Sequence, residues 1–424
     1  MKHYSFLLIL FMALCLSLGN GNKAQAGSLQ TKGVWVSCFE FEELGLKDKT
    51  EAQFRANANK IFATIRANGC NTVYFHVRAY DDAIYPSSVA GFSKYISSDG
   101  KAPGYDPLKI LVSLAHSHKL KIHAWMNPYR VSSTKILDPA RETTTVRIVN
   151  QVKEIINRYA VDGIHFDDYF YPTNIKKYKK VPAATRRQNV NVMVRKVYQA
   201  VKQKKKSLKF GISPAGDITY CEKIGADVRT WLSQSGYVDY IIPQIYWSNN
   251  YIMSGKKTAL FNERLAKWRE INKRDVPMYV GLALYKTGYS LKEDPGWKKS
   301  SGNIASQIRL IRSGNTEGYV FFAYKDLIRS GAAKELKKYY KAIGKITLNK
   351  KKKTLRAGKK YRLKVSFWPA NLHGKIKWKS SNKKIASVSK KGIVKAKKKG
   401  TVRIYATYGT MKKSCKIIVK KKRK

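Results

Sequence analysis

Short runs rich in β-branched and aromatic residues alternate with helix-like segments along most of this chain. Eight such runs lie between Gly33 and Leu327, and amphipathic segments such as residues 51–69 separate them. The runs begin at Gly33, Asn71, Leu120, Asp162, Lys209, Val238, Pro277 and Gly318. Strand and helix in strict alternation favour a parallel sheet with helices on its outer face.

Eight strand–helix units over roughly 300 residues fit a closed barrel better than an open doubly wound sheet. No glycine-rich nucleotide fingerprint follows the first run, which argues against a dinucleotide-binding fold. We therefore predict an α/β fold, a (β/α)8 TIM barrel, for residues 27–344.

The first 26 residues have the pattern of a cleaved signal peptide. Lys2 gives a basic start, residues 6–18 form an apolar run, and Ala24-Gln25-Ala26 is a small-residue cleavage site. The apolar run is too short to span a membrane. We expect a secreted, extracellular protein, associated with the cell wall, with no transmembrane segment after signal cleavage.

Four cysteines follow the leader, at positions 38, 70, 221 and 415, and their spacing matches no metal site. An oxidising exterior would permit one disulfide, but buried free thiols are the favoured interpretation because cysteine behaves as a small apolar residue. We predict neither a metal nor a cofactor.

The composition changes abruptly after Gly344. Residues 345–424 contain 30 Lys or Arg and no Asp or Glu, so all 27 acidic residues lie upstream. Apolar and polar residues nevertheless alternate between Gly, Asn and Ser turns, which is typical of short antiparallel strands. We predict a small, lysine-rich, all-β sandwich over residues 345–424.

The stretch from Ile376 to Ala406 closely resembles the bacterial immunoglobulin-like (Ig-like) domains of group 2. The matching positions are Trp378, Ser380, Ser381, Asn382, Ile385, Ala386, Val388, Gly392, Val394, Ala396, Gly400 and Thr401. The high lysine content departs from a typical member.

A formal net charge of +57 calls for an anionic partner or a salt-rich medium. For an exported protein we expect the basic C-terminal domain to bind anionic wall polymers, with no specific binding of nucleic acid. The alternative is a solubilising surface that has no dedicated ligand.

Alternation along the strands predicts which side chains face the barrel interior. On the second strand, Tyr74, His76 and Arg78 point inward. The third strand directs His123, Trp125 and Asn127 inward, and the fourth directs His165 and Asp167 inward. We expect the three histidines to be satisfied core groups, and Arg78 and Asn127 to partner a buried Asp167 carboxylate.

The run DGIHFDDYFYP, residues 162–172, delivers two adjacent carboxylates to the end of the fourth strand. Active sites of such barrels are built from residues at the carboxyl ends of the strands. Asp167 and Asp168 are therefore the predicted catalytic residues.

Several segments resemble a glycosyl-hydrolase-like bacterial family, typified by divisomal hydrolases specific for denuded peptidoglycan. They are residues 77–88, 104–116, 122–131, 161–172, 211–216 and 238–247. The resemblance implies cleavage of glycan strands from which the stem peptides have been removed. It also implies site positions at Arg78, Asp82, Asn127, Arg130, Asp167, Asp168, Ser213, Gln244 and Tyr246.

Glycoside hydrolysis needs one carboxyl that protonates the leaving oxygen and one that stabilises or attacks the anomeric carbon. We assign the second role to Asp167. Asp168 is the first candidate for the acid, provided that the chain turns directly after Asp167, and Asp82 and Asp217 are the next candidates.

Flat apolar faces of sugars stack on aromatic rings, and aromatic residues are abundant near the predicted strand ends. The candidates are Tyr80, Tyr85, Trp125, Tyr129, Tyr169, Phe170, Tyr171, Tyr246, Trp247, Tyr285 and Tyr324. Trp125, Tyr171 and Trp247 are included among the predicted substrate-binding residues, whereas Phe321 and Phe322 are expected to belong to the core.

Two functions of different classes remain open. One is a secreted glycoside hydrolase that acts on cell-wall glycan, namely peptide-free peptidoglycan or another N-acetylated polysaccharide. The other is a non-catalytic protein whose barrel binds wall polysaccharide.

Overall fold

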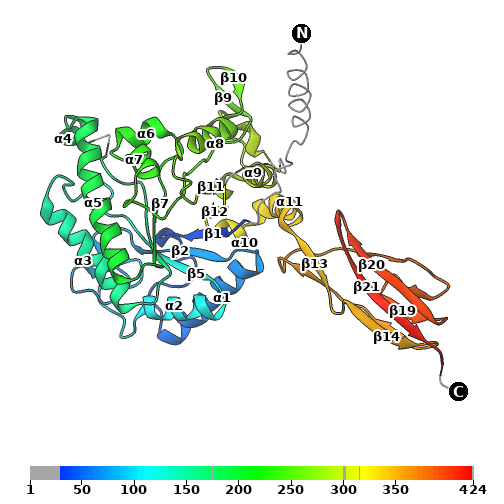
Figure 1. Ribbon diagram of the computed structural model, residues 1–424. Coiled ribbons are helices and arrows are strands. Elements are labelled where there is room, and N and C mark those ends of the chain that lie inside the picture. Colours follow the sequence, from blue (N-terminus) through cyan, green and yellow to red (C-terminus); the bar gives the residue numbers. More distant parts are fainter. Residues whose placement is uncertain (1–28, 173–174, 299–301, 315, 423–424) are drawn as a thin grey trace, which may run out of the picture.

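The computed structural model describes residues 29–172, 175–298, 302–314 and 316–422. They form a large α/β body and a slender β body that projects from it (Figure 1). The predicted signal peptide, residues 1–26, lies outside the described residues. No helix in the described part of the chain is long and apolar enough to cross a membrane.

A parallel sheet of eight strands, counted over the described residues, forms the centre of the large body. The hydrogen-bonded order is β11-β12-β1-β2-β5-β6-β7-β8, and the parallel bridges Ile241–Met278 and Gln244–Gly281 close it into a barrel. The strands are β1 (Thr31–Val36), β2 (Thr72–Arg78), β5 (Lys121–Met126), β6 (Gly163–Phe166), β7 (Lys209–Ile212), β8 (Tyr240–Ile241), β11 (Tyr279–Ala283) and β12 (Gly318–Phe322). Each overlaps one of the predicted runs, although β1 begins two residues before its run, so the predicted TIM barrel is confirmed.

Helices surround the barrel (Figure 1). They are α1 (Glu51–Ala67), α2 (Pro107–Ser117), α3 (Glu142–Arg158), α4 (Lys176–Lys179), α5 (Ala183–Lys204), α6 (Ile218–Lys223), α7 (Val228–Ser233), α8 (Leu260–Ile271), α9 (Asn303–Arg312), α10 (Lys325–Ile328) and α11 (Ala333–Ile343). Helix α1 shows why they form: Thr50 and Gln53 make a capping box, and Phe54, Phe62 and Ile65 are buried on one face.

Side chains of the barrel strands divide into two layers. Val73, Phe75 and Val77 of β2 join the large core between strands and helices. Tyr74 joins a smaller cluster with Trp35 and other residues inside the barrel. The alternation predicted for β2 therefore holds as far as His76, after which the register with β5 shifts.

A polar network crosses the barrel interior. The Trp35 Nε1–H donates to His165 Nε2 at 3.1 Å. The Tyr240 hydroxyl lies 3.2 Å from His165 Nδ1 and 2.9 Å from His123 Nδ1. His123 and His165 are thus satisfied core groups, as predicted, and burial lowers the pKa of His123 to about 4. The same prediction is wrong for His76, whose Nε2 has no hydrogen-bond partner in the described part of the chain.

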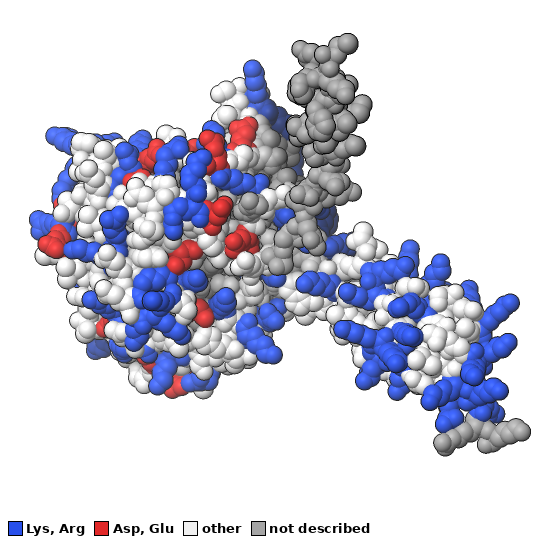
Figure 2. Space-filling view, viewed as in Figure 1, with Lys and Arg blue, Asp and Glu red and all other residues white. Residues whose placement is uncertain are grey.

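The β body is a sandwich that begins at Lys345, directly after α11 and Gly344. Its strands are β13 (Lys345–Leu348), β14 (Lys352–Arg356), β15 (Lys360–Arg362), β16 (Val365–Trp368), β17 (Lys377–Ser380), β18 (Ala386–Val388), β19 (Ile393–Ala396), β20 (Gly400–Tyr408) and β21 (Met411–Lys420). The sheets β14-β21-β20-β17 and β15-β19-β18 enclose a core that contains Leu363, Val394, Ile404 and Ile417. Lys and Arg side chains are spread over the visible face of this body, with uncharged residues between them, whereas acidic residues are seen on the barrel (Figure 2).

All four cysteines of the described chain, Cys38, Cys70, Cys221 and Cys415, are buried free thiols, which agrees with the favoured interpretation of the sequence. Burial raises the pKa of each thiol. They are inert packing groups, since the thiolate is the reactive form.

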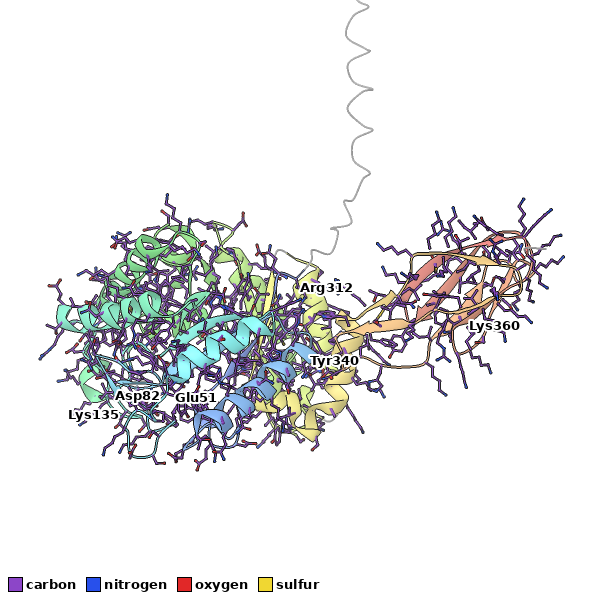
Figure 3. The ribbon with its side chains drawn as sticks, turned by 90° about the horizontal axis from the view of Figure 1, so that it is seen from below. Glu51, Asp82, Lys135, Arg312, Tyr340 and Lys360 are labelled. Carbon is purple, nitrogen blue, oxygen red and sulfur yellow. The ribbon has the colours of Figure 1, made fainter. Side chains whose placement is uncertain are left out.

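The sandwich docks on the face of the barrel where the strands begin. Asn68, just before β2, accepts hydrogen bonds at its side-chain oxygen from Asn371 and from the Tyr340 hydroxyl. The ammonium of Lys32, at the start of β1, lies 4.7 Å from the Trp368 ring centroid. Tyr340 marks this junction, and Asp82 lies at the end of the barrel remote from the sandwich (Figure 3).

Candidate active site

The two carboxylates lie at the point where β6 ends. The strand stops at Phe166, and the Asp167 N–H still donates to Met126 O at 3.2 Å. The chain then turns: the Asp168 N–H donates to Asp167 Oδ1 at 2.9 Å, and the Phe170 N–H donates to Asp168 O at 2.8 Å. Because the chain turns at once, both side chains face one cavity. The assignment of Asp168 as the acid depended on such a turn directly after Asp167.

This central cavity has a volume of about 220 Å³. Residues that follow directly on strands line it, among them Asn127 after β5, Asp167 after β6 and Ser213 after β7. The full lining is Trp35, Ser37, Phe39, His76, Trp125, Asn127, Arg130, Asp167, Asp168, Tyr169, Ser213, Gln244, Tyr246, Tyr285 and Phe322. It therefore lies at the carboxyl ends of the strands, opposite the docked sandwich.

The Asp167 and Asp168 carboxyl groups are hydrogen-bonded to each other. Burial, followed by the charge of Asp167, raises the pKa of Asp168 well above its ordinary value. Burial also raises the pKa of Asp167, but hydrogen bonds from Asp168 and Gln244 oppose this shift. The coupled pair therefore favours a shared proton, and the shift toward the protonated form is the larger for Asp168.

Gln244 fixes the orientation of Asp167. Its Nε2–H2 group donates to Asp167 Oδ1 at 3.2 Å and to Ser213 O at 2.8 Å. The backbone of Gln244 bridges to Ala215 and to Gly281, which holds the residue between neighbouring strands. Two donated hydrogen bonds, from Asp168 N–H and Gln244, thus stabilise the ionised form of Asp167.

Arg130 contributes a guanidinium group to the cavity wall. Its guanidinium carbon lies 4.1 Å from the ring centroid of Tyr169 and 5.0 Å from that of Tyr80. The positive charge of Arg130 lowers the pKa of both aspartates, although less than burial raises it. Stacking between two rings keeps this guanidinium at the mouth of the cavity.

Three polar atoms on the cavity wall have no hydrogen-bond partner within the described part of the chain. They are Asn127 Oδ1, Trp125 Nε1 and His76 Nε2, and all three side chains are buried. The His76 and Trp125 rings stack at 3.8 Å. Buried polar atoms normally have partners, so these three atoms, on residues that line the cavity, are exceptions.

Four predicted substrate-binding residues do not line the central cavity. Asp82 lines a neighbouring cavity and accepts from the Tyr80 N–H. The Tyr171 hydroxyl is bonded to Asn189, and Trp247 lies beneath the Arg264 guanidinium. The remaining predicted residues of the set, Trp125, Asn127, Arg130, Ser213, Gln244 and Tyr246, do line it.

The fourth residue outside the cavity is Arg78, and the prediction that Arg78 and Asn127 partner Asp167 is wrong. Arg78 donates to the carbonyls of Asn127 and Pro128, and its Nη2 lies 3.0 Å from Asp81 Oδ1. Asn127 donates to Ala79 O at 2.9 Å instead of to the carboxylate. The register of β2 against β5 shifts between His76 and Arg78, so Arg78 does not point into the barrel as the alternation predicted.

The reserve candidate for the acid, Asp217, is a helix cap. Its side chain accepts from Tyr220 N–H at the start of α6 and forms an ion pair with Arg264 at 2.5 Å. Asp217 therefore does not contribute a carboxyl to the central cavity.

Five residues line the central cavity without having been predicted as substrate contacts, namely Trp35, Ser37, Phe39, His76 and Phe322. Period-two alternation applied to the first and last barrel strands would have found Trp35 and Phe322, which point inward. Phe39 follows β1, on the 3-10 helix η1 (Cys38–Glu40). Because it lies outside the strand, the alternation of apolar and polar residues along β1 does not predict where its ring points. No group of three or more His, Cys, Asp or Glu side chains within the described ranges could hold a metal ion.

Two parts of the chain match known family profiles. Residues 30–136, 129–188 and 179–299 match the family described as Glycosyl hydrolase-like 10. Residues 342–419 match the family described as Bacterial Ig-like domain (group 2), as the sequence resemblance predicted.

Two curated relatives are described as glycosyl hydrolases. "Glycosyl hydrolase YngK" of Bacillus subtilis (strain 168) is 29% identical over 360 residues, which cover 70% of this chain and 69% of YngK. "Glycosyl hydrolase DigH" of Escherichia coli (strain K12) is 32% identical over 300 residues, which cover 55% of this chain and 66% of DigH.

Solved structures share the fold at low sequence identity. The PgaB (BpsB) glycoside hydrolase domain of Bordetella bronchiseptica superposes with a TM-score of 0.52 at 11% identity and covers 72% of this chain and 98% of that domain. Catalytic domain 2 of an Ostrinia furnacalis group II chitinase gives a TM-score of 0.50 at 10% identity, covering 74% of this chain and 96% of that domain. At this identity the likeness extends to the barrel architecture alone.

Proposed function

Because this chain belongs to the glycosyl hydrolase-like 10 family, we propose that its barrel hydrolyses glycosidic bonds in the glycan of the cell wall. The substrate we propose is peptidoglycan glycan from which the stem peptides have been removed. The observation that carries the proposal is the hydrogen-bonded pair Asp167–Asp168 in an aromatic-lined cavity at the barrel mouth. A protonated carboxyl beside an ionised one is the equipment that glycoside hydrolysis requires.

Asp168 is the general acid in this proposal. Its raised pKa favours the protonated carboxyl, which can give its proton to the leaving oxygen as the C1–O bond breaks. Asp167 acts in its ionised form, which two donated hydrogen bonds favour, and it stabilises positive charge that develops at the anomeric centre.

The contact between the carboxyl groups bears on the route of the reaction. Retaining enzymes hold their two carboxyls about 5–5.5 Å apart, and inverting enzymes hold them about 6.5–9.5 Å apart, so that a sugar or a water fits between. Groups that hydrogen-bond to each other leave no such space. The arrangement favours participation of a substrate N-acetyl group, whose oxygen attacks C1 while Asp167 accepts the amide N–H.

In this route, water then opens the cyclic intermediate. Water adds to C1, the acetamide is restored, and the proton that water releases returns to Asp168, so that the enzyme is regenerated. The scheme requires an N-acetylated sugar on the side of the cleaved bond that carries C1. Glycan strands of the wall meet that requirement.

The basic sandwich supports a location at the wall. Residues 345–424 carry no acidic side chain, and they dock on the barrel face opposite the central cavity. We propose that the protein is secreted and that this surface binds anionic wall polymers, which keeps the barrel near its substrate without covering it.

Digestion of purified glycan tests the function. The wild-type chain should release new reducing ends from peptide-free strands, with product masses that identify the cleaved linkage, and release fewer from strands that retain their peptides. Asp167→Asn should lose turnover and retain sugar binding. The matched control is Asp275→Asn, because Asp275 is exposed and lies before β11, at the opposite end of the barrel.

A barrel that only binds polysaccharide would release no reducing ends from any glycan even in its wild-type form. Equal loss of turnover in the Asp275→Asn control would mean that the Asp167 result reflects a general effect on folding. Cleavage of other N-acetylated polysaccharides, with peptide-free peptidoglycan left intact, would contradict the proposed substrate.

A further inference from the structure

A second cavity adjoins the central one and is larger, with a volume of about 670 Å³. Its wall comes from the loops that follow β1, β2 and β5, and it includes the short strands β3 (Asp82–Ala83) and β4 (Gly91–Phe92). The lining is Cys38, Phe39, Glu42, Lys47, Tyr80, Asp81, Asp82, Gly91, Phe92, Lys94, Tyr95 and Val131. Phe39 lines both cavities, so the two form neighbouring parts of one binding surface.

Phe39 is an exposed apolar side chain on a rigid support. The ring is 63% exposed, and it contacts Tyr95 edge-on at 5.6 Å. The helix turn that carries it, η1, begins with a capping box between Ser37 and Glu40. The buried Glu40 carboxylate also accepts the Lys325 N–H at 2.7 Å, which ties this turn to the end of the last barrel strand.

Aromatic rings connect the second cavity with the carboxyl pair. The Tyr80 and Tyr95 rings stack at 6.3 Å. Arg130 lies over Tyr80 on one side and over Tyr169, next to Asp168, on the other. Rings in a row offer successive stacking positions to the apolar faces of successive sugars.

The charges of the second cavity suit a sugar better than a polyanion. Its wall carries two lysines and three acidic residues, in a chain whose formal net charge is +57. Asp81 is neutralised by Arg78 and Arg147, and Lys47 pairs with Glu42 at 3.6 Å. A wall with paired charges and exposed rings has no strong attraction for phosphate-bearing polymers.

We propose that this second cavity is a binding subsite for further sugar residues of the glycan strand that the central cavity holds. This inference rests on the proposed function for the identity of the chain, but the subsite itself can be tested without catalysis. Because the second cavity has about three times the volume of the first, long chains should bind much better than short ones.

Gly91 offers a way to block the subsite without disturbing the core. A side-chain carbon built at Gly91 would meet no atom within 4 Å, the position is exposed, and it has no positive φ. Gly91→Phe should therefore fold normally and occupy part of the second cavity. Tyr289→Ala is the control, because Tyr289 is exposed by 53% and lines neither cavity.

The experiment measures binding of N-acetylglucosamine oligomers of increasing length to the full chain carrying Asp168→Asn, by calorimetry. We expect the Kd to improve at least tenfold from the shortest to the longest oligomer. Gly91→Phe should remove most of that improvement, whereas Tyr289→Ala should keep it. Phe92→Ala, which removes a ring from the same wall, should reduce the improvement in the same direction.

Binding that does not depend on chain length, or a length dependence that survives Gly91→Phe in full, would overturn the subsite. These outcomes are independent of turnover. A wild-type chain that cleaves nothing, but whose length-dependent binding is lost in Gly91→Phe, would refute the proposed hydrolysis and support the subsite.

Discussion

Replacement of Asp168 by Asn should stabilise the folded barrel, and the gain should increase with pH. The pKa of Asp168 is raised in the folded state by burial and by Asp167. A carboxyl whose pKa is raised in the folded state contributes its full stabilisation at pH values below its unfolded pKa, near 4. This stabilisation is lost as the pH rises from there through the folded pKa. The amide introduced by Asp168→Asn carries no such proton, so the variant escapes this loss.

The slope of the free energy of unfolding against pH sets the size of the expected stability difference. One group whose folded form holds a proton that the unfolded form has lost changes the free energy of unfolding by about 1.4 kcal/mol per pH unit. Between pH 5 and pH 7, the variant should therefore gain at most about 2–3 kcal/mol on the wild type, and less to the extent that solvent reaches the partly buried side chain.

Urea unfolding followed by tryptophan fluorescence at pH 5, 6 and 7 measures this difference. Other groups with shifted pKa values, such as Glu40 at about 7 and His76 at about 3, contribute to both proteins and cancel in the comparison. Asp275→Asn should show a difference from the wild type that does not change with pH. A difference for Asp168→Asn that is constant, or that shrinks as the pH rises, would refute the shared-proton assignment.

Three further predictions concern other parts of the molecule. Gln244→Leu removes a hydrogen bond that favours ionised Asp167, so the acidic limb of the pH profile of kcat/KM should move to higher pH. Tyr240→Phe leaves the facing nitrogens of His123 and His165 without their partner, and it should lower the free energy of unfolding by about 1–3 kcal/mol in urea titrations. Sedimentation with purified walls should show strong binding at low salt and weak binding at a few hundred millimolar salt, because the sandwich attracts polyanions through charge. Binding of equal strength at both salt concentrations would contradict this.

The fold was predictable from the spacing of apolar residues along the sequence. Barrel strands buried on both faces appear as short β-rich runs, and helices such as α1 show apolar residues at helical spacing, so the barrel was predictable. The sandwich was predictable for the same reason, because its strands alternate despite their lysines. These patterns are local, and each element carries its own signal.

The site was predictable where a residue directly follows a strand. Asn127 and Asp167 lie at the strand ends, where alternation and the barrel rule together direct them to the cavity, and Ser213, which follows β7, was predicted from the family resemblance. Arg78 breaks the rule because the register shifts after His76 and because Asp81 competes for its guanidinium. Neither the shift nor the competing partner has a signature in the sequence.

Loop aromatics were the least predictable part of the site. Tyr171 and Phe39 both lie beyond a barrel strand, yet Tyr171 is buried against α5 through Asn189, whereas Phe39 stands exposed between two cavities. Which way a ring turns in a loop depends on tertiary contacts, and spacing along the chain does not encode them.

The dependence of Asp168→Asn on the leaving group tests the central claim most directly. A general acid is needed for a sugar leaving group, but not for an activated aryl group such as dinitrophenolate, which departs without a proton. The account predicts that Asp168→Asn loses kcat by a factor of at least about 100 on glycan strands and retains most of its kcat on a dinitrophenyl glycoside of N-acetylglucosamine. Equal losses on both substrates, or no loss on either, would contradict it.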